Sequence, residues 1–265
     1  MQDLSIALIQ TDLHWEQTDA NLAMLEETIR GINAKVDIIL LPEMFTTGFS
    51  MNAEKLAEPP GGRTFRWMRQ MANVKDAAIA GSYILKEQSN FYNRLYFVCP
   101  DGSATYYDKR HLFTLAREDK VYIPGNEKKI IEFKGWRIMP LICYDLRFPV
   151  WSRSEKSTEQ TYQYDLLIYV ANWPDARIEA WDALLKARAI ENIAYAAGLN
   201  RTGIDGYPKE YPGHSAVYRY DGKQLAFSDK KEDILLVNLS SESQLQFRKR
   251  FDFQNDADSF RLISH

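Results

Sequence analysis

The chain has 265 residues, enough for one large domain or two small ones, and folding can bury roughly 70–75% of the surface that such an unfolded chain exposes. Its net charge of −3 provides no basic excess of the kind that recruits nucleic acid, so a small-molecule ligand is favoured. The two cysteines, Cys99 and Cys143, cannot form a disulfide framework and suit a reducing cytosol. The N-terminus has no signal-peptide pattern, and no apolar run approaches the roughly 20 residues of a membrane span, so we expect a cytoplasmic protein that does not enter a membrane.

The first half of the chain alternates apolar strands with helical patterns. Residues 4–10 (LSIALIQ) predict a strand, residues 17–33 an amphipathic helix, and residues 36–42 (VDIILLP) a short buried strand ended by Pro42. A turn and a helix are expected over residues 61–72. Strand-like segments then follow at residues 77–85, 93–100, 103–109 and 128–133.

The second half continues this mixture. The expected strands are residues 137–143, 165–172, 214–220 and 232–239. The expected helices are residues 176–197, ending near Gly198, and a charged segment near 240–250. Residues 154–161 are polar and predict an exposed loop. Strands and helices interleaved in this way, without repeats or a linker, indicate an α/β fold in a single domain over residues 1–265.

Three reactive side chains each follow an apolar strand: Glu43, Lys109 and Cys143. Strand ends in α/β sheets commonly form ligand sites, because the loops there converge. If the residues after Cys143 start a helix, its N-terminal amides would favour the thiolate and lower the thiol pKa. Taken alone, each residue also has an ordinary explanation: a buried cysteine can be a small hydrophobe, as we expect for Cys99, and a lysine or glutamate can be solvated.

The flanks of these residues carry more information than the residues alone. The segments LPEMF, YDKRHLF and LICYDLRFP closely resemble the three signature segments of the nitrilase superfamily, also called carbon–nitrogen hydrolases. The order Glu, Lys, Cys matches, as do the separations of 66 and 34 residues. The resemblance implies a four-layer α-β-β-α sandwich and a catalytic triad in which Cys143 is the nucleophile, Glu43 the general base and acid, and Lys109 a cation beside the thiolate and the oxyanion.

The same resemblance implies further site residues. Glu118 is expected to be a second glutamate beside the triad, although Asp119 or a solvated loop charge are alternatives. The backbone N–H of Tyr144 would assist Lys109 at the oxyanion. Trp173 forms either an apolar pocket wall or part of the core, and Arg147 either pairs with a substrate carboxylate or holds the fold.

No metal or organic cofactor is expected. The four histidines form no ligand pair at helical or strand spacing, and neither a Cys-x-x-Cys nor a Gly-rich phosphate loop is present; these histidines are His14, His111, His214 and His265.

The flanks TTGFSM, CYDLRFPVW and ANWP look like the ω-amidase subgroup. That resemblance implies hydrolysis of α-ketoglutaramate or α-ketosuccinamate to the keto diacid and ammonia, with the amide and water as the only partners besides a second copy in a homodimer. Another superfamily amidase, acting on an aliphatic or carbamoyl amide, or a nitrilase, remains an alternative. Outside this class, a Cys–His hydrolase using His214 or a catalytically silent binding protein also remains open.

Overall fold

The computed structural model describes residues 2–155, 162–260 and 262. Most of the predicted loop over residues 154–161 lies outside the described residues. The prediction of exposure is wrong for Ser154, which is 1% exposed and whose backbone N–H donates to Asn192. No helix among the described residues is both long and apolar enough to cross a membrane.

The first of two six-stranded sheets has the strand order β14-β1-β2-β3-β4-β5. Its members are β1 (Leu4–Gln10), β2 (Ile38–Leu40), β3 (Ala78–Glu87), β4 (Asn90–Val98), β5 (Ala104–Asp108) and β14 (Asp233–Leu239). Strands β1, β2 and β3 are parallel to one another, and the remaining neighbours pair antiparallel. The last strand, β14, therefore returns to pair with the first.

The second sheet repeats this plan with the order β13-β12-β9-β8-β7-β6. Its members are β6 (Ile131–Phe133), β7 (Trp136–Ile142), β8 (Leu166–Ala171), β9 (Tyr195–Asn200), β12 (Ser215–Tyr218) and β13 (Gln224–Ser228). Strands β7, β8 and β9 are parallel. A separate hairpin consists of β10 (Thr202–Ile204) and β11 (Glu210–Pro212).

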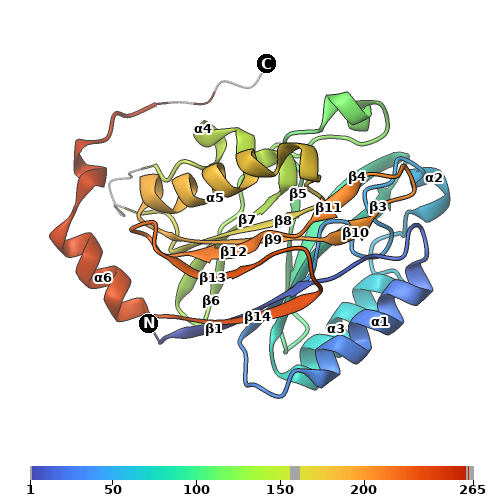
Figure 1. The fold of residues 1–265 in the computed structure, drawn as a ribbon, viewed down its shortest axis with the longest axis horizontal. Helices are drawn as coiled ribbons and strands as arrows, with labels where there is room; N and C mark the ends of the chain where they lie inside the picture. The colour runs from blue at the N-terminus through green and yellow to red at the C-terminus, as the bar shows by residue number, and fades with distance from the viewer. Residues whose placement is uncertain (1, 156–161, 261, 263–265) are drawn as a thin grey trace.

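Helices cover the outer faces of the two sheets (Figure 1). The longer ones are α1 (Thr18–Gly31), α3 (Arg63–Lys75), α5 (Ile178–Asn192) and α6 (Ser241–Arg250), and the short ones are α2 (Ala53–Leu56) and α4 (Pro149–Ser152). The described residues also include the 3-10 turns η1 (Thr114–Ala116), η2 (Glu118–Lys120), η3 (Cys143–Arg147), η4 (Asp175–Arg177) and η5 (Phe253–Asp256). Helices α1 and α3 lie against the first sheet and α5 against the second, so the four-layer α-β-β-α prediction is confirmed.

Alternation along β1 shows how one strand serves two cores. Leu4, Ile6 and Leu8 belong to the core between the two sheets, whereas Ala7 and Ile9 belong to the core under α1 and α3. Successive strand side chains point to opposite faces, so a strand buried on both faces must be apolar throughout. Each such Leu or Ile contributes roughly 1.5–3 kcal/mol relative to an exposed side chain.

The predicted helix over residues 176–197 is wrong at its C-terminal end. Helix α5 ends at Asn192, and Ile193 adopts a left-handed conformation with φ +46°. Residues 195–200 instead form the central strand β9 between β8 and β12. The Ala-rich segment has helical propensity, but pairing on both sides and complete burial outweigh it.

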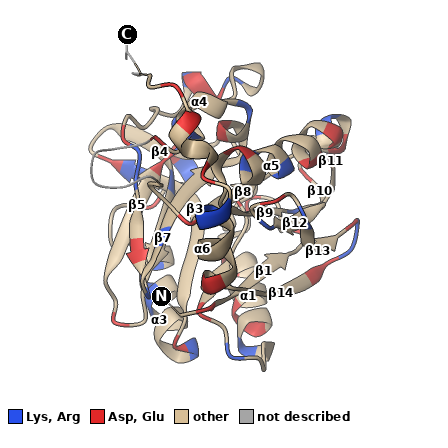
Figure 2. Ribbon diagram, turned by 90° about the vertical axis from the view of Figure 1, so that its left-hand side faces the viewer, with Lys and Arg blue, Asp and Glu red and all other residues tan. Residues whose placement is uncertain are grey.

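Charged residues of both signs are interspersed over the surface elements seen in Figure 2. The expectation that no basic face recruits nucleic acid stays a prediction, because the structure contains no partner that tests it.

Candidate active site

Four polar side chains follow strands that end at one edge of the sandwich. Glu43 follows β2 and Lys109 follows β5 in the first sheet, while Cys143 follows β7 and Asn172 follows β8 in the second. Strand β5 runs in the same direction as β3, because both are antiparallel to β4. The carboxyl ends of these strands therefore meet, and the predicted residues come together where the two sheets face each other.

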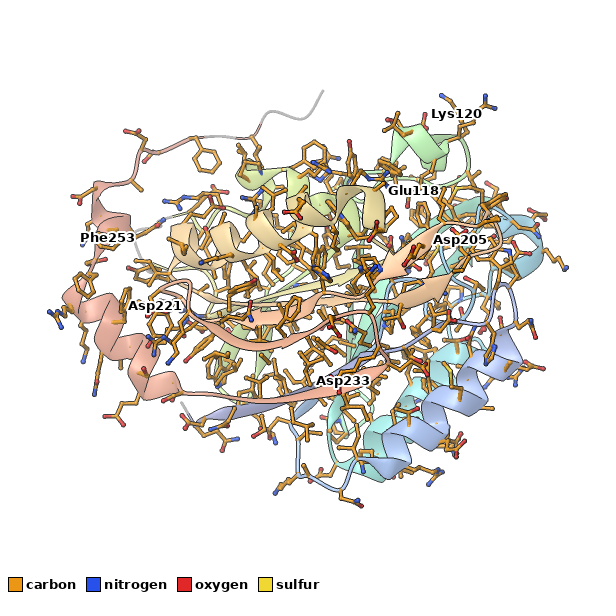
Figure 3. The ribbon with its side chains drawn as sticks, in the orientation of Figure 1. Glu118, Lys120, Asp205, Asp221, Asp233 and Phe253 are labelled. Carbon is orange, nitrogen blue, oxygen red and sulfur yellow. The ribbon has the colours of Figure 1, made fainter. Side chains whose placement is uncertain are left out.

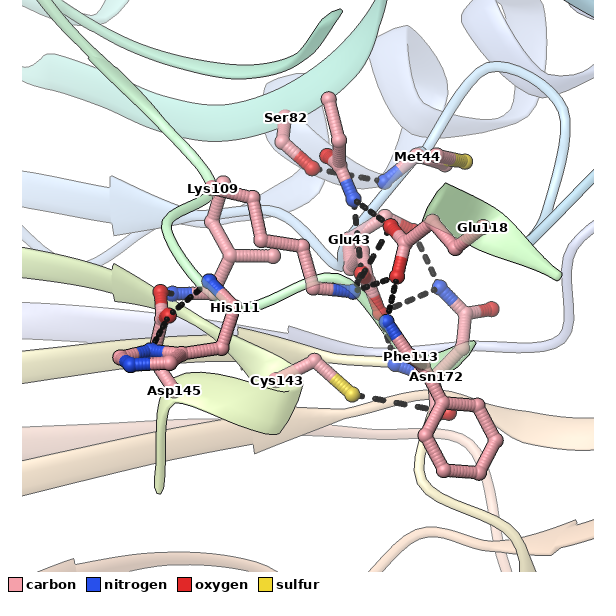
Figure 4. A network of polar contacts seen from close by, with 12 residues as sticks. Glu43, Met44, Ser82, Lys109, His111, Phe113, Glu118, Cys143, Asp145 and Asn172 are labelled. Carbon is pink, nitrogen blue, oxygen red and sulfur yellow. Dashed lines mark hydrogen bonds and ion pairs between the residues drawn. The ribbon is translucent and has the colours of Figure 1, made fainter. Parts of the chain in front are cut away.

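The Lys109 ammonium lies between two carboxylates (Figure 4). Its Nζ donates to Glu43 Oε1 at 2.9 Å and to Glu118 Oε2 and Oε1 at 2.9 and 3.0 Å. All three side chains are fully buried. A buried ion pair is stable only when its remaining donors and acceptors are satisfied. The hydrogen bonds to Glu43 and Glu118 satisfy the Lys109 ammonium and fix its position.

Two asparagines orient Glu43. Asn93 Nδ2 donates to Oε1 at 2.8 Å, and the backbone N–H of Asn172 donates to Oε2 at 2.8 Å. Asn172 Nδ2 also donates to the Glu43 backbone carbonyl at 2.6 Å. Sequence reasoning missed Asn93, because the same strand also contains Asn90 and Arg94 and no local pattern distinguishes Asn93 from them.

The structure places Glu118, and not Asp119, beside Lys109. Glu118 opens η2, and its Oε2 also accepts the backbone N–H of Phe113 at 2.6 Å. Asp119 pairs with the exposed Lys120 instead. Of the two residues considered from the sequence, only Glu118 reaches the buried cluster.

The charges of the cluster influence one another. Burial alone would favour the neutral amine of Lys109, but Glu118 and Glu43 outweigh it and raise its pKa, so this residue is an ammonium ion. Burial also raises the pKa of Glu118, since Lys109 only partly offsets the burial and the nearby charge of Glu43. The Lys109 ammonium is therefore the shared ion-pair partner of Glu43 and Glu118.

Cys143 occupies a strained turn. Its φ is +44°, in the left-handed region that non-glycine residues seldom adopt, and such strain costs of order 1–3 kcal/mol. It begins η3, and its Sγ donates to the Asn172 carbonyl at 3.8 Å. The sulfur points toward the carbonyl of Asn172, the residue whose backbone N–H donates to Glu43 (Figure 4).

The expected lowering of the thiol pKa is wrong. Burial raises the pKa of Cys143 well above its ordinary value, the charge of Glu43 adds to this effect, and Lys109 opposes it without reversing it. The turn η3 has only five residues, too few to supply the dipole of a full helix. The thiol is therefore the favoured form of Cys143 at rest, and a reaction through its thiolate would need a base.

Asp145 stabilises the turn η3 through hydrogen bonds. Its carboxylate accepts the backbone N–H groups of Ile142 and His111, each at 3.0 Å, and the Tyr107 hydroxyl at 2.8 Å. His111 Nδ1 lies 2.8 Å from Asp145 Oδ1, and its ring stacks on Phe148 at 3.8 Å. This network connects the segment after Lys109 to the turn that carries Cys143.

A pocket of about 430 Å³, including the space at its mouth, opens onto Cys143. It is lined by Phe49, Lys109, Phe113, Cys143, Tyr144, Arg147, Asn172, Trp173, Pro174, Arg177, Lys209 and Tyr211. The predicted Tyr144, Arg147 and Trp173 thus share one cavity with the sulfur. Trp173 is 3% exposed and also contacts Trp181, so it is pocket wall and core at once.

Sequence reasoning missed two cations in this pocket. Arg177 lies on η4 and Lys209 on the segment between β10 and β11. Neither follows a long apolar strand, so the pattern that led to Glu43, Lys109 and Cys143 could not single them out.

Among the described residues, no group of three or more His, Cys, Asp or Glu side chains is arranged to hold a metal ion. Glu43 and Glu118 have Lys109 between them, where a cation would otherwise bind.

The fold and the site define a carbon–nitrogen hydrolase. Residues 5–249 match the model of the carbon–nitrogen hydrolase family, and the chain belongs to that family. It is 44% identical over 265 residues to the ω-amidase YafV of Escherichia coli K12, covering 99% of this chain and all of that protein. It is 31% identical over 255 residues to the 2-oxoglutaramate amidase of Bacillus subtilis, with 95% and 96% of the two chains covered.

Solved structures agree with the fold. A CN-hydrolase superfamily protein of Xanthomonas campestris, with an arsenic adduct in its active site, is 41% identical with a TM-score of 0.96, and 99% of this chain and all of that one are covered. The nitrilase-superfamily member Nit3 of Saccharomyces cerevisiae, 23% identical with a TM-score of 0.82 and 94% of both chains covered, shares the fold. The predicted family is therefore confirmed.

Proposed function

We propose that this enzyme is an ω-amidase, which hydrolyses the terminal amide of a short α-keto diacid through an acyl-enzyme on Cys143. The observation that carries the proposal is the joint placement of the Cys143 sulfur, the Lys109 ammonium and three further cations in one pocket. Relatives that cover nearly the whole chain are named ω-amidase and 2-oxoglutaramate amidase, which supports the same substrate class.

In the first half of the reaction, Glu43 takes the thiol proton while the sulfur attacks the amide carbon. Glu43 is suited to this role because it is oriented by Asn93 and Asn172 and contributes to the raised thiol pKa. The negative charge that develops on the amide oxygen is stabilised by the Lys109 ammonium and the Tyr144 backbone N–H. Glu43 then returns its proton to the departing nitrogen, and ammonia leaves.

In the second half, water replaces ammonia. Glu43 takes a proton from the water, whose oxygen attacks the thioester carbon, and the same donors stabilise the second tetrahedral intermediate. The carbon–sulfur bond breaks, the thiol regains its proton, and the keto diacid is released. Glu118 accepts from the Lys109 ammonium with both carboxylate oxygens, so we assign it to positioning Lys109.

The substrate carries a carboxylate at the end away from the reacting carbon, and burying that charge without a partner would be costly. Arg147 lines the pocket, with its guanidinium 4.9 Å from the centre of the Trp173 ring. We propose that Arg147 contributes to binding the carboxylate and that Trp173 packs against the short carbon chain.

The test is a comparison of kcat/KM on α-ketoglutaramate, α-ketosuccinamate, pentanamide and pentanenitrile. We expect the charged amides to be hydrolysed far better than the neutral compounds, because the cations would be left unpaired. Cys143→Ala should abolish turnover, whereas Cys99→Ala, a change outside the pocket, should retain it. Equal turnover of the neutral amide would contradict the substrate assignment, and activity in Cys143→Ala would contradict the mechanism.

The Cys–His alternative receives no support from His214. Its Nδ1 lies 2.8 Å from Asp182, and it is absent from the pocket lining. The proposed mechanism predicts that activity survives His214→Gln.

A homodimer and a cytoplasmic location remain proposals. The surface near α4 has exposed apolar side chains, including Val150 at 47% and Phe260 at 37%, and α4 follows the turn of the nucleophile. This fits pairing through the helices that flank Cys143, and sedimentation at micromolar concentration measures it: a sedimenting mass of one chain would contradict it.

A further inference from the structure

The pocket has more positive charge than its buried cluster neutralises. Lys109 has two carboxylate partners, but Arg147, Arg177 and Lys209 form no ion pair with any residue that the structure describes. Nearby cations outside the pocket do pair: Arg201 with Asp12, and Lys230 with Glu210 at 3.5 Å. Three cations without an ion-pair partner among the described residues give the cavity a positive potential that attracts an anion.

Arg177 is held at the pocket wall by its own turn. The Trp173 indole N–H donates to the Arg177 carbonyl at 2.8 Å, which fixes η4 against the pocket. The guanidinium lies 4.9 Å from the centre of the Phe113 ring, a cation–π distance that orients it without consuming its hydrogen-bond donors. These donors are therefore available to a ligand.

Lys209 comes from a different element. It lies between β10 and β11, and strand β11 packs beside η4, so Lys209 and Arg177 approach the pocket from adjacent elements. The backbone N–H of Lys209 donates to Asp205 at 3.0 Å, the residue lines the pocket, and its ammonium lies 5.9 Å from the centre of the Tyr207 ring. The ammonium can bind an anion without disturbing the hairpin.

Asp205 organises this hairpin from the inside. It is 7% exposed, and it accepts the backbone N–H of Tyr207 at 2.8 Å and the hydroxyl of the pocket residue Tyr211 at 2.8 Å. Asp205 and Glu118 lie at the same end of the molecule (Figure 3). The Asp205 carboxylate bonds within the hairpin, and among the described residues it forms no ion pair with the Lys209 ammonium.

We propose that Arg177 and Lys209 form an anion-binding subsite. In addition to Arg147, this subsite binds the substrate carboxylate that lies distant from Cys143, and it selects carboxylate-bearing amides. The proposal rests on the proposed function, since it assigns one end of that substrate. A dicarboxylate of the same length presents the same group, so glutarate should occupy the subsite and compete with the substrate.

The test uses charge-removing variants on the full-length enzyme. Lys209→Met and Arg177→Met should each lower kcat/KM for α-ketoglutaramate roughly 10- to 100-fold, the range of a lost hydrogen bond to a charged group. Turnover of pentanamide, which has no carboxylate, should not fall. Lys209→Arg should restore most of the activity, and Lys230→Met is the matched control because it removes an exposed lysine that contacts the same hairpin. Equal losses on both amides would show a structural effect and overturn the proposal.

A binding measurement separates this proposal from the proposed function. Calorimetry with Cys143→Ala measures glutarate affinity without turnover. We expect Lys209→Met to weaken glutarate binding roughly 10-fold or more in that background, while Lys230→Met leaves it unchanged. If the wild-type enzyme shows no preference for the charged amide, the proposed function fails, yet a loss of glutarate affinity in Lys209→Met would still support the subsite. If glutarate does not bind, or binds equally to both variants, the subsite is overturned.

Discussion

The buried cluster contains one ammonium ion between two carboxyl groups, and the two groups differ in their nearest further partners. Glu43 accepts from Asn93 at 2.8 Å and from the Asn172 backbone, whereas Glu118 accepts from the Phe113 backbone and from Asn93 only at 3.5 Å. These partners support the separate roles that we propose, in which Glu43 exchanges a proton with the Cys143 sulfur and Glu118 positions Lys109. Two chemically identical side chains thus differ through their surroundings.

The Cys143 thiol gives a testable prediction about pH dependence. Burial and the charge of Glu43 raise the pKa of Cys143, so alkylation by iodoacetamide should be slow at pH 7 and accelerate only above the ordinary thiol range. Glu43→Gln removes the negative neighbour and should move the midpoint of this profile to lower pH, while abolishing turnover. Mass spectrometry of labelled Cys143 in a Cys99→Ser background measures the profile. An unchanged or higher midpoint in Glu43→Gln would show that the two groups do not interact.

Residues with local signatures were predictable, and residues placed by long-range packing were not. Glu43, Lys109 and Cys143 each follow an apolar strand and have distinctive flanks. Asn93 lies within a strand, and Lys209 in a short hairpin without apolar periodicity. Nothing near them in the chain indicates that they approach a site built from other strands.

At the scale of elements, the sequence predicts the strands of the first sheet well because they are apolar and bounded by turns. It fails at β9, where the segment YAAGLN lacks β-branched residues and continues the pattern of α5. The strand exists because β8 and β12 pair with it, information that lies elsewhere in the chain.

Gly198 shows how closely α5 approaches this strand. A Cβ at Gly198 would lie 2.3 Å from Leu185 and 2.8 Å from Trp181, both on α5. We expect Gly198→Ala to destabilise the fold by about 1–3 kcal/mol, the cost of overpacking a core. Gly31→Ala is the matched control, because nothing lies within 4 Å of its position and alanine favours a helix. Urea unfolding measures both; a Gly198→Ala protein as stable as Gly31→Ala would mean that the helix moves away at little cost.

For the whole molecule, the site depends on the contact between the sheets. Glu43 and Lys109 come from the first sheet, and Cys143 and Asn172 from the second, so neither sheet alone holds all the residues of the proposed site. The hydrogen bond from the Asn172 backbone N–H to Glu43 crosses this boundary, and so does the hydrogen bond from the Tyr107 hydroxyl to Asp145; each is 2.8 Å long. The interleaved strand and helix pattern indicated the α/β class, but the face-to-face packing that creates the site was expected only through the family resemblance.

The core between the sheets also argues for a single domain. Leu4, Ile6 and Leu8 of the first sheet share one apolar cluster with Ile138 and Leu141 of the second. Separating the sheets would expose this cluster on both sides, at roughly 25 cal/mol for each Å² of apolar surface. We infer that the chain unfolds as one cooperative unit. Calorimetry should therefore show a single heat-absorption transition, and the loss of amidase activity should coincide with it because the site spans both sheets. Two resolved transitions, with activity lost at the first, would show instead that each sheet and its helices form an independent domain.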